Sequence, residues 1–276
     1  MSAIAYAAAM LRARTARRLA LLVVCLALLP LGPSWSQQAD IPGPIHAGNT
    51  FGWYPTAWRD EFIGPLKSVW HKRGTGGVYT KNGMFTMTAG RHGDVSAKLD
   101  MSGHATGRWE IRWKARERRS GRGHYTLRTE LVPAGDRKQY CGARDVAIES
   151  YTMAHPRMKF YINNLPDLAF RATKGPTYAG YSHDHWHTFA VEVTPSRISW
   201  FVDAKVIRSE RRPEALSGVP FTVQLSMDPV PGVRMHPATM QLDWMRYWTL
   251  AKPNDKSVAA PQTTLGHYRK ACPPPA

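Results

Sequence analysis

Alternating apolar and polar positions recur in short segments along the chain. The clearest segment covers residues 108–115, where Trp109, Ile111, Trp113 and Ala115 alternate with charged side chains. A period of two residues is typical of a β-strand that is buried on one face, so we expect a strand here. The same reasoning predicts further strands at residues 84–87, 124–132, 144–151, 157–162, 187–194, 197–203, 220–227 and 239–249.

Turn-forming residues separate these segments at short intervals. Asn82-Gly83, Asn163-Asn164 and Gly175 are examples of such breaks between expected strands. No segment beyond residue 36 keeps the 3.6-residue period of an amphipathic helix. Many short strands joined by regular turns predict an all-β fold, in which two antiparallel sheets form a sandwich in a single domain.

Composition divides the chain into four parts. Residues 1–36 join arginines to an apolar run of 11 residues (19–29) and then to small residues, which is the layout of a secretory signal peptide. The alternative is a membrane anchor, but a spanning helix needs roughly 20 apolar residues. We therefore expect no stable membrane span, and a secreted protein that is extracellular or associated with a cell wall. Residues 37–58 are predicted to be a leader segment, 59–250 the domain and 251–276 a C-terminal tail.

The chain is strongly basic. It has 37 Lys and Arg against 20 Asp and Glu, and residues 37–276 keep 33 of these bases and all 20 acids, a net charge of +13. This charge favours anionic partners, so we expect a polysaccharide or cell-wall glycan, anionic ones included. No helix-turn-helix, zinc-finger or RNA-binding signature is present, and we expect no nucleic-acid partner. A basic surface that serves solubility alone is the alternative. We expect a monomer.

Two cysteines, Cys141 and Cys272, follow the signal segment. An even pair in an exported chain predicts one disulfide bond between them. Neither cysteine has the surroundings of a metal ligand, and the histidines at 183, 185 and 187 lack carboxylate or thiolate spacing that would support a site. We therefore expect no metal and no cofactor.

Two of the expected strands bring acidic side chains together. In residues 124–132, alternation points Leu127 and Leu131 to the core and leaves Arg128 and Glu130 on the other face. Carboxylates on an open sheet face are the groups that glycoside hydrolysis uses. A solvated face held by salt bridges is the alternative. In residues 144–151, strict alternation places four residues on that same outer face: Asp145, Ala147, Glu149 and Tyr151.

Four motifs follow one another along residues 58–250. They are DEF at 60–62 with Trp70, GRWEIR at 107–112, WHTFAVEVTP…ISWFVD at 186–203 and PATMQLDWMRY at 237–247. Together they resemble the motifs of glycoside hydrolase family 16, the laminarinase and lichenase type. The resemblance implies a concanavalin A-like jelly roll and hydrolysis of O-glycosidic bonds of a polysaccharide. We expect Arg128, Tyr151 and Trp186 to contact this substrate.

The catalytic strand of this family has the pattern Glu-x-Asp-x-Glu, or a variant with one more residue before the last Glu. The first Glu is the nucleophile and the last is the acid/base. The shorter pattern aligns with Asp145, Ala147 and Glu149, whereas the longer one would use Arg144 and Val146, and alternation points Val146 to the core. The resemblance thus implies Glu149 as acid/base and Asp145 as nucleophile or electrostatic partner.

The catalytic motif is incomplete. Asp145 is one methylene shorter than Glu, and a misplacement of about 1 Å can cost on the order of a hundredfold in rate. Ala147 removes the central carboxylate, and Glu130 on the neighbouring strand is a third candidate catalytic residue. Two alternatives to an enzyme follow: a non-catalytic glycan or cell-wall binding module on the same fold, and a structural surface protein without a glycan ligand.

Overall fold

The computed structural model describes residues 45–134, 142–155, 157–165, 174–179, 183–216 and 218–262. These residues belong to one compact unit. The signal segment, Cys141 and Cys272 lie outside the described residues, so the cleavage and the disulfide bond stay predictions. Within the described ranges, no helix is both long and apolar enough to cross a membrane.

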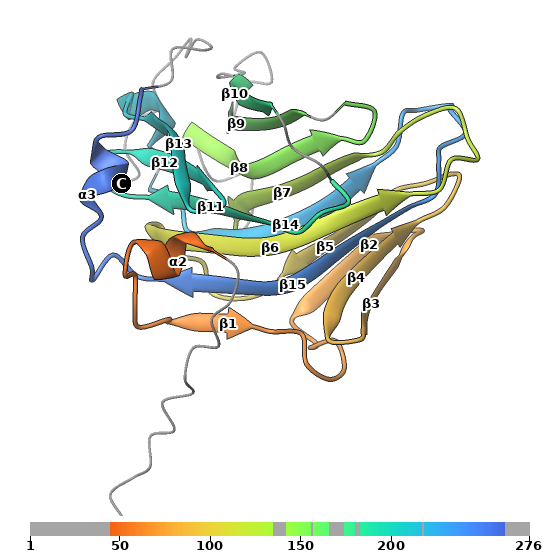
Figure 1. The fold of residues 1–276 in the computed structure, drawn as a ribbon, viewed down its shortest axis with the longest axis horizontal. Coiled ribbons are helices and arrows are strands. Elements are labelled where there is room, and N and C mark those ends of the chain that lie inside the picture. Colours follow the sequence, from red (N-terminus) through yellow and green to blue (C-terminus); the bar gives the residue numbers. More distant parts are fainter. Residues whose placement is uncertain are drawn as a thin grey trace, which may run out of the picture. The chain divides into compact units, whose positions relative to one another are not determined.

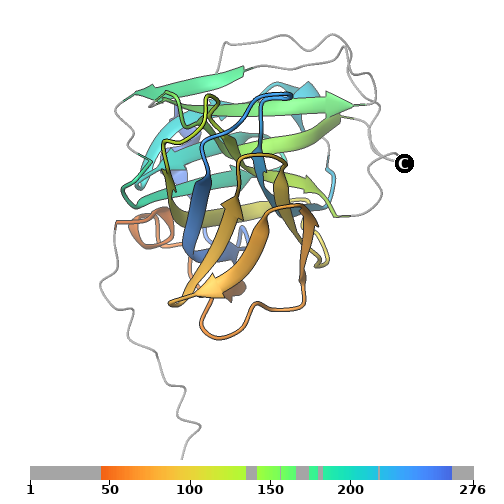
Figure 2. The same cartoon turned by 90° about the vertical axis from the view of Figure 1, so that its right-hand side faces the viewer.

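The described strands form two antiparallel sheets (Figures 1 and 2). They are β1 (Trp58–Asp60), β2 (Trp70–Gly74), β3 (Gly77–Lys81), β4 (Met84–Ala89), β5 (Val95–Leu99), β6 (Gly107–Glu117), β7 (Thr126–Pro133), β8 (Gly142–Thr152), β9 (Arg157–Leu165), β10 (Lys174–Ala179), β11 (His187–Val193), β12 (Ile198–Val202), β13 (Lys205–Glu210), β14 (Phe221–Asp228) and β15 (Ala238–Trp248). The eight-stranded sheet has the order β13-β12-β11-β6-β15-β4-β3, and β1 pairs with β15. The seven-stranded sheet has the order β10-β9-β8-β7-β14-β5-β2.

The predicted antiparallel sandwich is confirmed, and each predicted strand has a counterpart. Those counterparts are β4, β6, β7, β8, β9, β11, β12, β14 and β15. Most of the strands that the pattern missed, namely β2, β3, β10 and β13, are the outermost strands of their sheets. An edge strand is covered less completely than a central one, so its polar and apolar residues alternate less cleanly.

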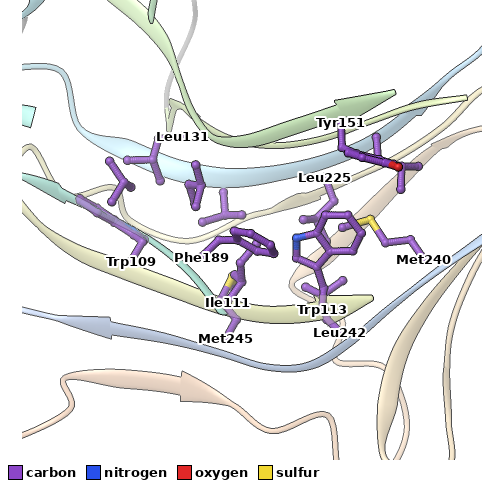
Figure 3. Close-up of a cluster of buried hydrophobic side chains, with 14 of the residues drawn as sticks. Trp109, Ile111, Trp113, Leu131, Tyr151, Phe189, Leu225, Met240, Leu242 and Met245 are labelled. Atoms are coloured by element: carbon purple, nitrogen blue, oxygen red, sulfur yellow. The ribbon is translucent and has the colours of Figure 1, made fainter. Parts of the chain in front are cut away.

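A hydrophobic core fills the space between the two sheets. Trp109, Ile111 and Trp113 of β6 point into it and meet Leu131 of β7 and Phe189 of β11 (Figure 3). The alternation predicted for residues 108–115 is therefore confirmed. Because these positions face inward, the charged residues between them face away from the core.

The segment before β1 packs on the outer side of the eight-stranded sheet. It contains a short helix, α2 (Ala47–Thr50), and Trp53 of this segment joins Phe201 and Trp248 in a second buried cluster. The buried carboxylate of Glu110 accepts the backbone N–H of Ala47 at 2.6 Å. Residues 45–58, predicted to be a leader, are thus held against the domain.

A buried ion pair lies on the same side of this sheet. Nε of Arg108 donates to Oε2 of Glu192 at 2.7 Å, and both side chains are almost fully buried. The guanidinium also donates to the carbonyl of Lys252 at 2.6 Å. The second oxygen of Glu192 accepts hydrogen bonds from Arg197 and from Ser257. Ser257 belongs to α3 (Asp255–Val258), so the pair ties the chain after β15 to the sheet.

Candidate functional site

The outer side of the seven-stranded sheet is where the sequence predicts the site. Leu127 and Leu131 of β7 are fully buried in the core, so Arg128 and Glu130 face the other way, as predicted. In the strand register, Glu130 lies opposite Ala147 of β8. The two strands that the sequence singled out are therefore neighbours.

Glu130 reaches across β8 to the next strand. Its carboxylate accepts a hydrogen bond from the hydroxyl of Tyr161 on β9, although β8 lies between β7 and β9. Ala147 lies opposite Glu130 on one side of β8, and on the other side Val146 lies opposite Ile162, the residue that follows Tyr161. The hydrogen bond therefore passes over Ala147, whose methyl group leaves room for it, and Glu130 is only 7% exposed. A carboxylate thus lies above β8 at Ala147.

Tyr161 is the residue of this site that the sequence analysis missed. Met158, Phe160 and Ile162 are buried in the core, so the alternation of β9 sends Tyr161 to the outer side. That signal is present in the sequence. The sequence does not reveal the sheet order that places β9 beside β8.

The prediction of strict alternation along β8 is wrong beyond Ala147. Ala147 lies opposite Glu130 and Ser150 lies opposite Arg128, so two residues of β8 face the single residue between Glu130 and Arg128. This is a β-bulge, which adds one residue to a strand and shifts its alternation. Glu149 lies in the bulge. Alternation therefore no longer predicts that Glu149 and Asp145 share one face.

Asp145 and Glu149 are described here by their backbone alone. Asp145 pairs with Asn163 of β9, and Glu149 pairs with Thr129 of β7. Their side chains lie outside the described part of the chain, so the catalytic roles expected for them stay predictions.

Tyr151 does not lie on the outer face, and its predicted contact with substrate is wrong. It lies opposite Leu127, is 1% exposed and packs in the core near Trp113 and Met240 (Figure 3). Its hydroxyl is hydrogen-bonded to Nδ1 of His183 at 2.8 Å. The physical reason is the bulge, because one extra residue moves Tyr151 from the outer row to the inner row.

Trp186 lies just before β11, which belongs to the other sheet. The guanidinium of Arg112 lies 4.7 Å from the centre of its ring, and the ammonium of Lys114 lies 4.5 Å from it. Both cations are on β6, on the side opposite Trp113, which faces the core. Trp186 and Arg128 therefore lie on the outer sides of different sheets and do not share one binding surface, and contact of Trp186 with a glycan stays a prediction.

Arg128 forms an ion pair at the outer face of the seven-stranded sheet. Its guanidinium lies 2.7 Å from the carboxylate of Asp228 on β14, and the hydroxyl of Ser226 donates to the same carboxylate at 3.0 Å. The side chain of Arg128 is 40% exposed. Arg128 stays a candidate for contact with an acidic group of a substrate.

A cluster of possible metal ligands lies beyond the end of β6. Atoms of Glu117, His124 and His236 lie within 4.8 Å of one another. However, Nδ1 of His236 accepts the backbone N–H groups of Ser120 and Gly121 at 2.9 and 2.8 Å. The neutral ring then carries its proton on Nε2, which has no lone pair for a metal. This geometry favours a hydrogen-bonded turn over a three-ligand metal centre.

Burial of two histidines makes stability depend on pH. Burial lowers the pKa of His183 and that of His104, so the folded protein favours their neutral forms. A histidine in the unfolded chain titrates near pH 6.5. Below that pH the unfolded chain binds more protons than the folded protein, so the free energy of unfolding falls. We expect the His104→Gln/His183→Gln variant to lose less unfolding free energy than the parent between about pH 7.5 and about pH 5.5. Urea unfolding at each pH measures this, and an equal loss of unfolding free energy in the variant and the parent would contradict it.

No protein-family model matches the chain, and no curated protein matches it. Among solved structures, one from work on endo-acting O-glycanases of human gut bacteria that initiate mucin breakdown has a TM-score of 0.59 and 14% identity, covering 71% of this chain and 99% of its own. The laminarinase of Rhodothermus marinus has a TM-score of 0.55 and 17% identity, covering 70% and 96%. A Mycobacterium tuberculosis protein described as an immunostimulatory antigen and pseudo β-1,3-glucanase has 0.53 and 16%, covering 70% and 98%.

These likenesses concern the fold, because the identities are low. The chain has the jelly-roll fold of laminarinases and related endo-glycosidases, as the four motifs implied.

Proposed function

We propose that this chain is a secreted glycoside hydrolase of the family 16 type, which cleaves O-glycosidic bonds of a polysaccharide on the outer face of the seven-stranded sheet. In this proposal Glu149 is the acid/base and Asp145 is the nucleophile or its electrostatic partner. Glu130 is the third carboxylate and replaces the central acid that Ala147 lacks.

The carboxylate of Glu130 above Ala147 carries the proposal. Residues directly opposite each other on paired strands have Cβ atoms about 5 Å apart, so a long side chain from β7 can reach over β8. The hydrogen bond from Tyr161 indicates that Glu130 does so. The incomplete motif of β8 is therefore accompanied by a carboxylate from the adjacent strand, held in place by a tyrosine from the strand on the other side.

The expected chemistry follows from these groups. The acid/base protonates the oxygen of the scissile bond while the second carboxylate attacks or stabilises the sugar carbon, and water then completes the hydrolysis. A nearby negative charge raises the pKa of a carboxylic acid, which keeps an acid/base protonated near neutral pH. Glu130 would supply this charge.

Replacement of Glu130 by Gln tests the proposal. Gln can still accept the hydrogen bond from Tyr161 but has no charge. One pKa unit corresponds to about 1.4 kcal/mol, so we expect kcat to fall about tenfold or more, with the alkaline limb of the pH–rate profile moved to lower pH. Tyr161→Phe, which removes this hydrogen bond and keeps the charge of Glu130, should lower kcat without moving that limb as far. Release of reducing ends from a panel of β-glucans, galactans and uronic-acid glycans measures kcat and its pH dependence for both variants.

Glu61→Gln is the matched control, because Glu61 pairs with Arg246 on the eight-stranded sheet, away from β8. A kcat of Glu130→Gln equal to that of Glu61→Gln would contradict the role of Glu130. Absence of turnover on every glycan in the panel would contradict hydrolysis itself.

The second candidate is a non-catalytic glycan-binding module on the same fold. Ala147 favours it, because the central acid of the family pattern is absent from β8. Similarity to a structure described as a pseudo β-1,3-glucanase agrees with it. This candidate predicts saturable binding of a glycan without turnover, and a rate that Glu130→Gln lowers would exclude it.

A further inference from the structure

A groove crosses the outer side of the eight-stranded sheet, away from the site proposed above. One row of residues runs across four neighbouring strands. Tyr79 of β3 lies opposite Thr86 of β4, Thr86 lies opposite Gln241 of β15, and Gln241 lies opposite Lys114 of β6. Three strand spacings make this row about 14 Å long.

The groove has a polar floor and an aromatic side chain at one end. Its volume is about 420 Å³. Thr239 and Gln241 supply uncharged hydrogen-bonding groups to its lining, and the almost fully buried Thr86 forms part of its floor. Tyr79 stands at one end and is 40% exposed. Hydroxyl and amide groups beside an exposed aromatic ring suit a sugar, since the ring stacks on its apolar face and the polar groups bind its hydroxyls.

Three cations line this groove: Lys81, Lys114 and Arg116. In the described part of the chain none of them forms an ion pair with a carboxylate. Neighbouring Arg112, by contrast, is paired with Asp243. The ammonium of Lys114 lies over the ring of Trp186, which extends the row beyond β6 with a second aromatic side chain. The groove therefore offers positive charge that the described residues do not neutralise.

We propose that this groove is a second binding site, for a polysaccharide that carries carboxylates, that is, a polyuronate. A glycan chain with one ring stacked on Tyr79 would lie along the row, with the carboxylate of one uronate unit toward Lys81 at one end and that of another unit toward Lys114 and Arg116 at the other. The planar guanidinium of Arg116 matches a carboxylate through two parallel hydrogen bonds. The site lies on the opposite sheet from Glu130 and does not depend on hydrolysis.

Charge-removing variants test the site with polygalacturonate as the probe. We expect Lys114→Gln/Arg116→Gln to weaken its binding about tenfold or more, measured by isothermal titration calorimetry. Tyr79→Ala should also weaken binding, through lost stacking. The matched control is Arg119→Gln/Arg122→Gln, which removes the same charge from two exposed residues outside the groove lining. The control should keep close to the parent's affinity.

Three results would overturn the proposal. An equal loss in the groove variant and the control variant would indicate general charge attraction alone. Tighter binding of dextran sulfate than of polygalacturonate would contradict a carboxylate site, and tighter binding of single-stranded DNA would contradict a glycan site. Any turnover on the seven-stranded sheet should be unaffected by the groove variants, so failure of the hydrolase proposal and failure of this one are separate observations.

Discussion

Replacement of Glu149 by Gln is expected to lower kcat by roughly a hundredfold to ten-thousandfold, with little change in affinity for the polysaccharide. A carboxamide has no acidic proton, so it cannot protonate the leaving oxygen or later activate water. Its size and most of its hydrogen bonds are kept, so binding should persist. Reducing-end release gives the rate, and calorimetry with the same polysaccharide gives the affinity.

The bulge in β8 makes a second variant necessary. Ser150, not Glu149, lies opposite Arg128 in the outer row. If Glu149 is the acid/base, Ser150→Ala should leave most of the rate intact. If Glu149→Gln hydrolyses the polysaccharide as fast as the parent, Glu149 is not the acid/base. Tight glycan binding by a chain that never shows turnover would favour the binding module instead.

Loss of Glu192 should have the largest effect on stability. Glu192→Ala removes the partner of Arg108 and leaves a guanidinium buried without its counter-charge, which typically costs about 3–5 kcal/mol. The same substitution releases Ser257 and Arg197 from the carboxylate. Urea unfolding followed by tryptophan fluorescence measures the free energy of unfolding.

Glu61→Ala is the matched control for this prediction. Glu61 pairs with Arg246 at 3.0 Å, but both side chains are partly exposed, so the pair should contribute about 1 kcal/mol or less. A cost for Glu192→Ala as small as that of Glu61→Ala would show that water reaches Arg108 once the carboxylate is gone. The cost of Glu192→Gln in unfolding free energy should lie between those of the two Ala variants, because Gln keeps hydrogen bonds and loses the charge.

The fold could be predicted because burial dictates a period of two. Trp109, Ile111 and Trp113 face the core, and their alternation with charged residues is visible in the sequence. The packing of residues 45–58 could not be predicted in the same way. Their attachment depends on Glu110, a charged residue on the outer side of β6 that reads as solvated until its partners are known.

The candidate site could be predicted only in part, and β8 explains why. Val146, Ala147 and Ile148 are apolar in sequence, so nothing in the pattern marks the residue that the bulge inserts. From that point the expected faces are shifted, which is why Tyr151 was expected outside and lies inside. Arg128 and Glu130 were placed correctly because β7 has no such interruption before Leu131.

The hydrogen bond between Tyr161 and Glu130 couples the effects of substitutions at positions 130 and 147. Restoring an Asp at 147 would set a second carboxylate directly beneath Glu130, and two like charges at that distance raise each other's pKa. The restored acid would thus be harmful while Glu130 remains, and useful only after Glu130 is replaced by a neutral residue. The effect of either change depends on the order in which the two occur.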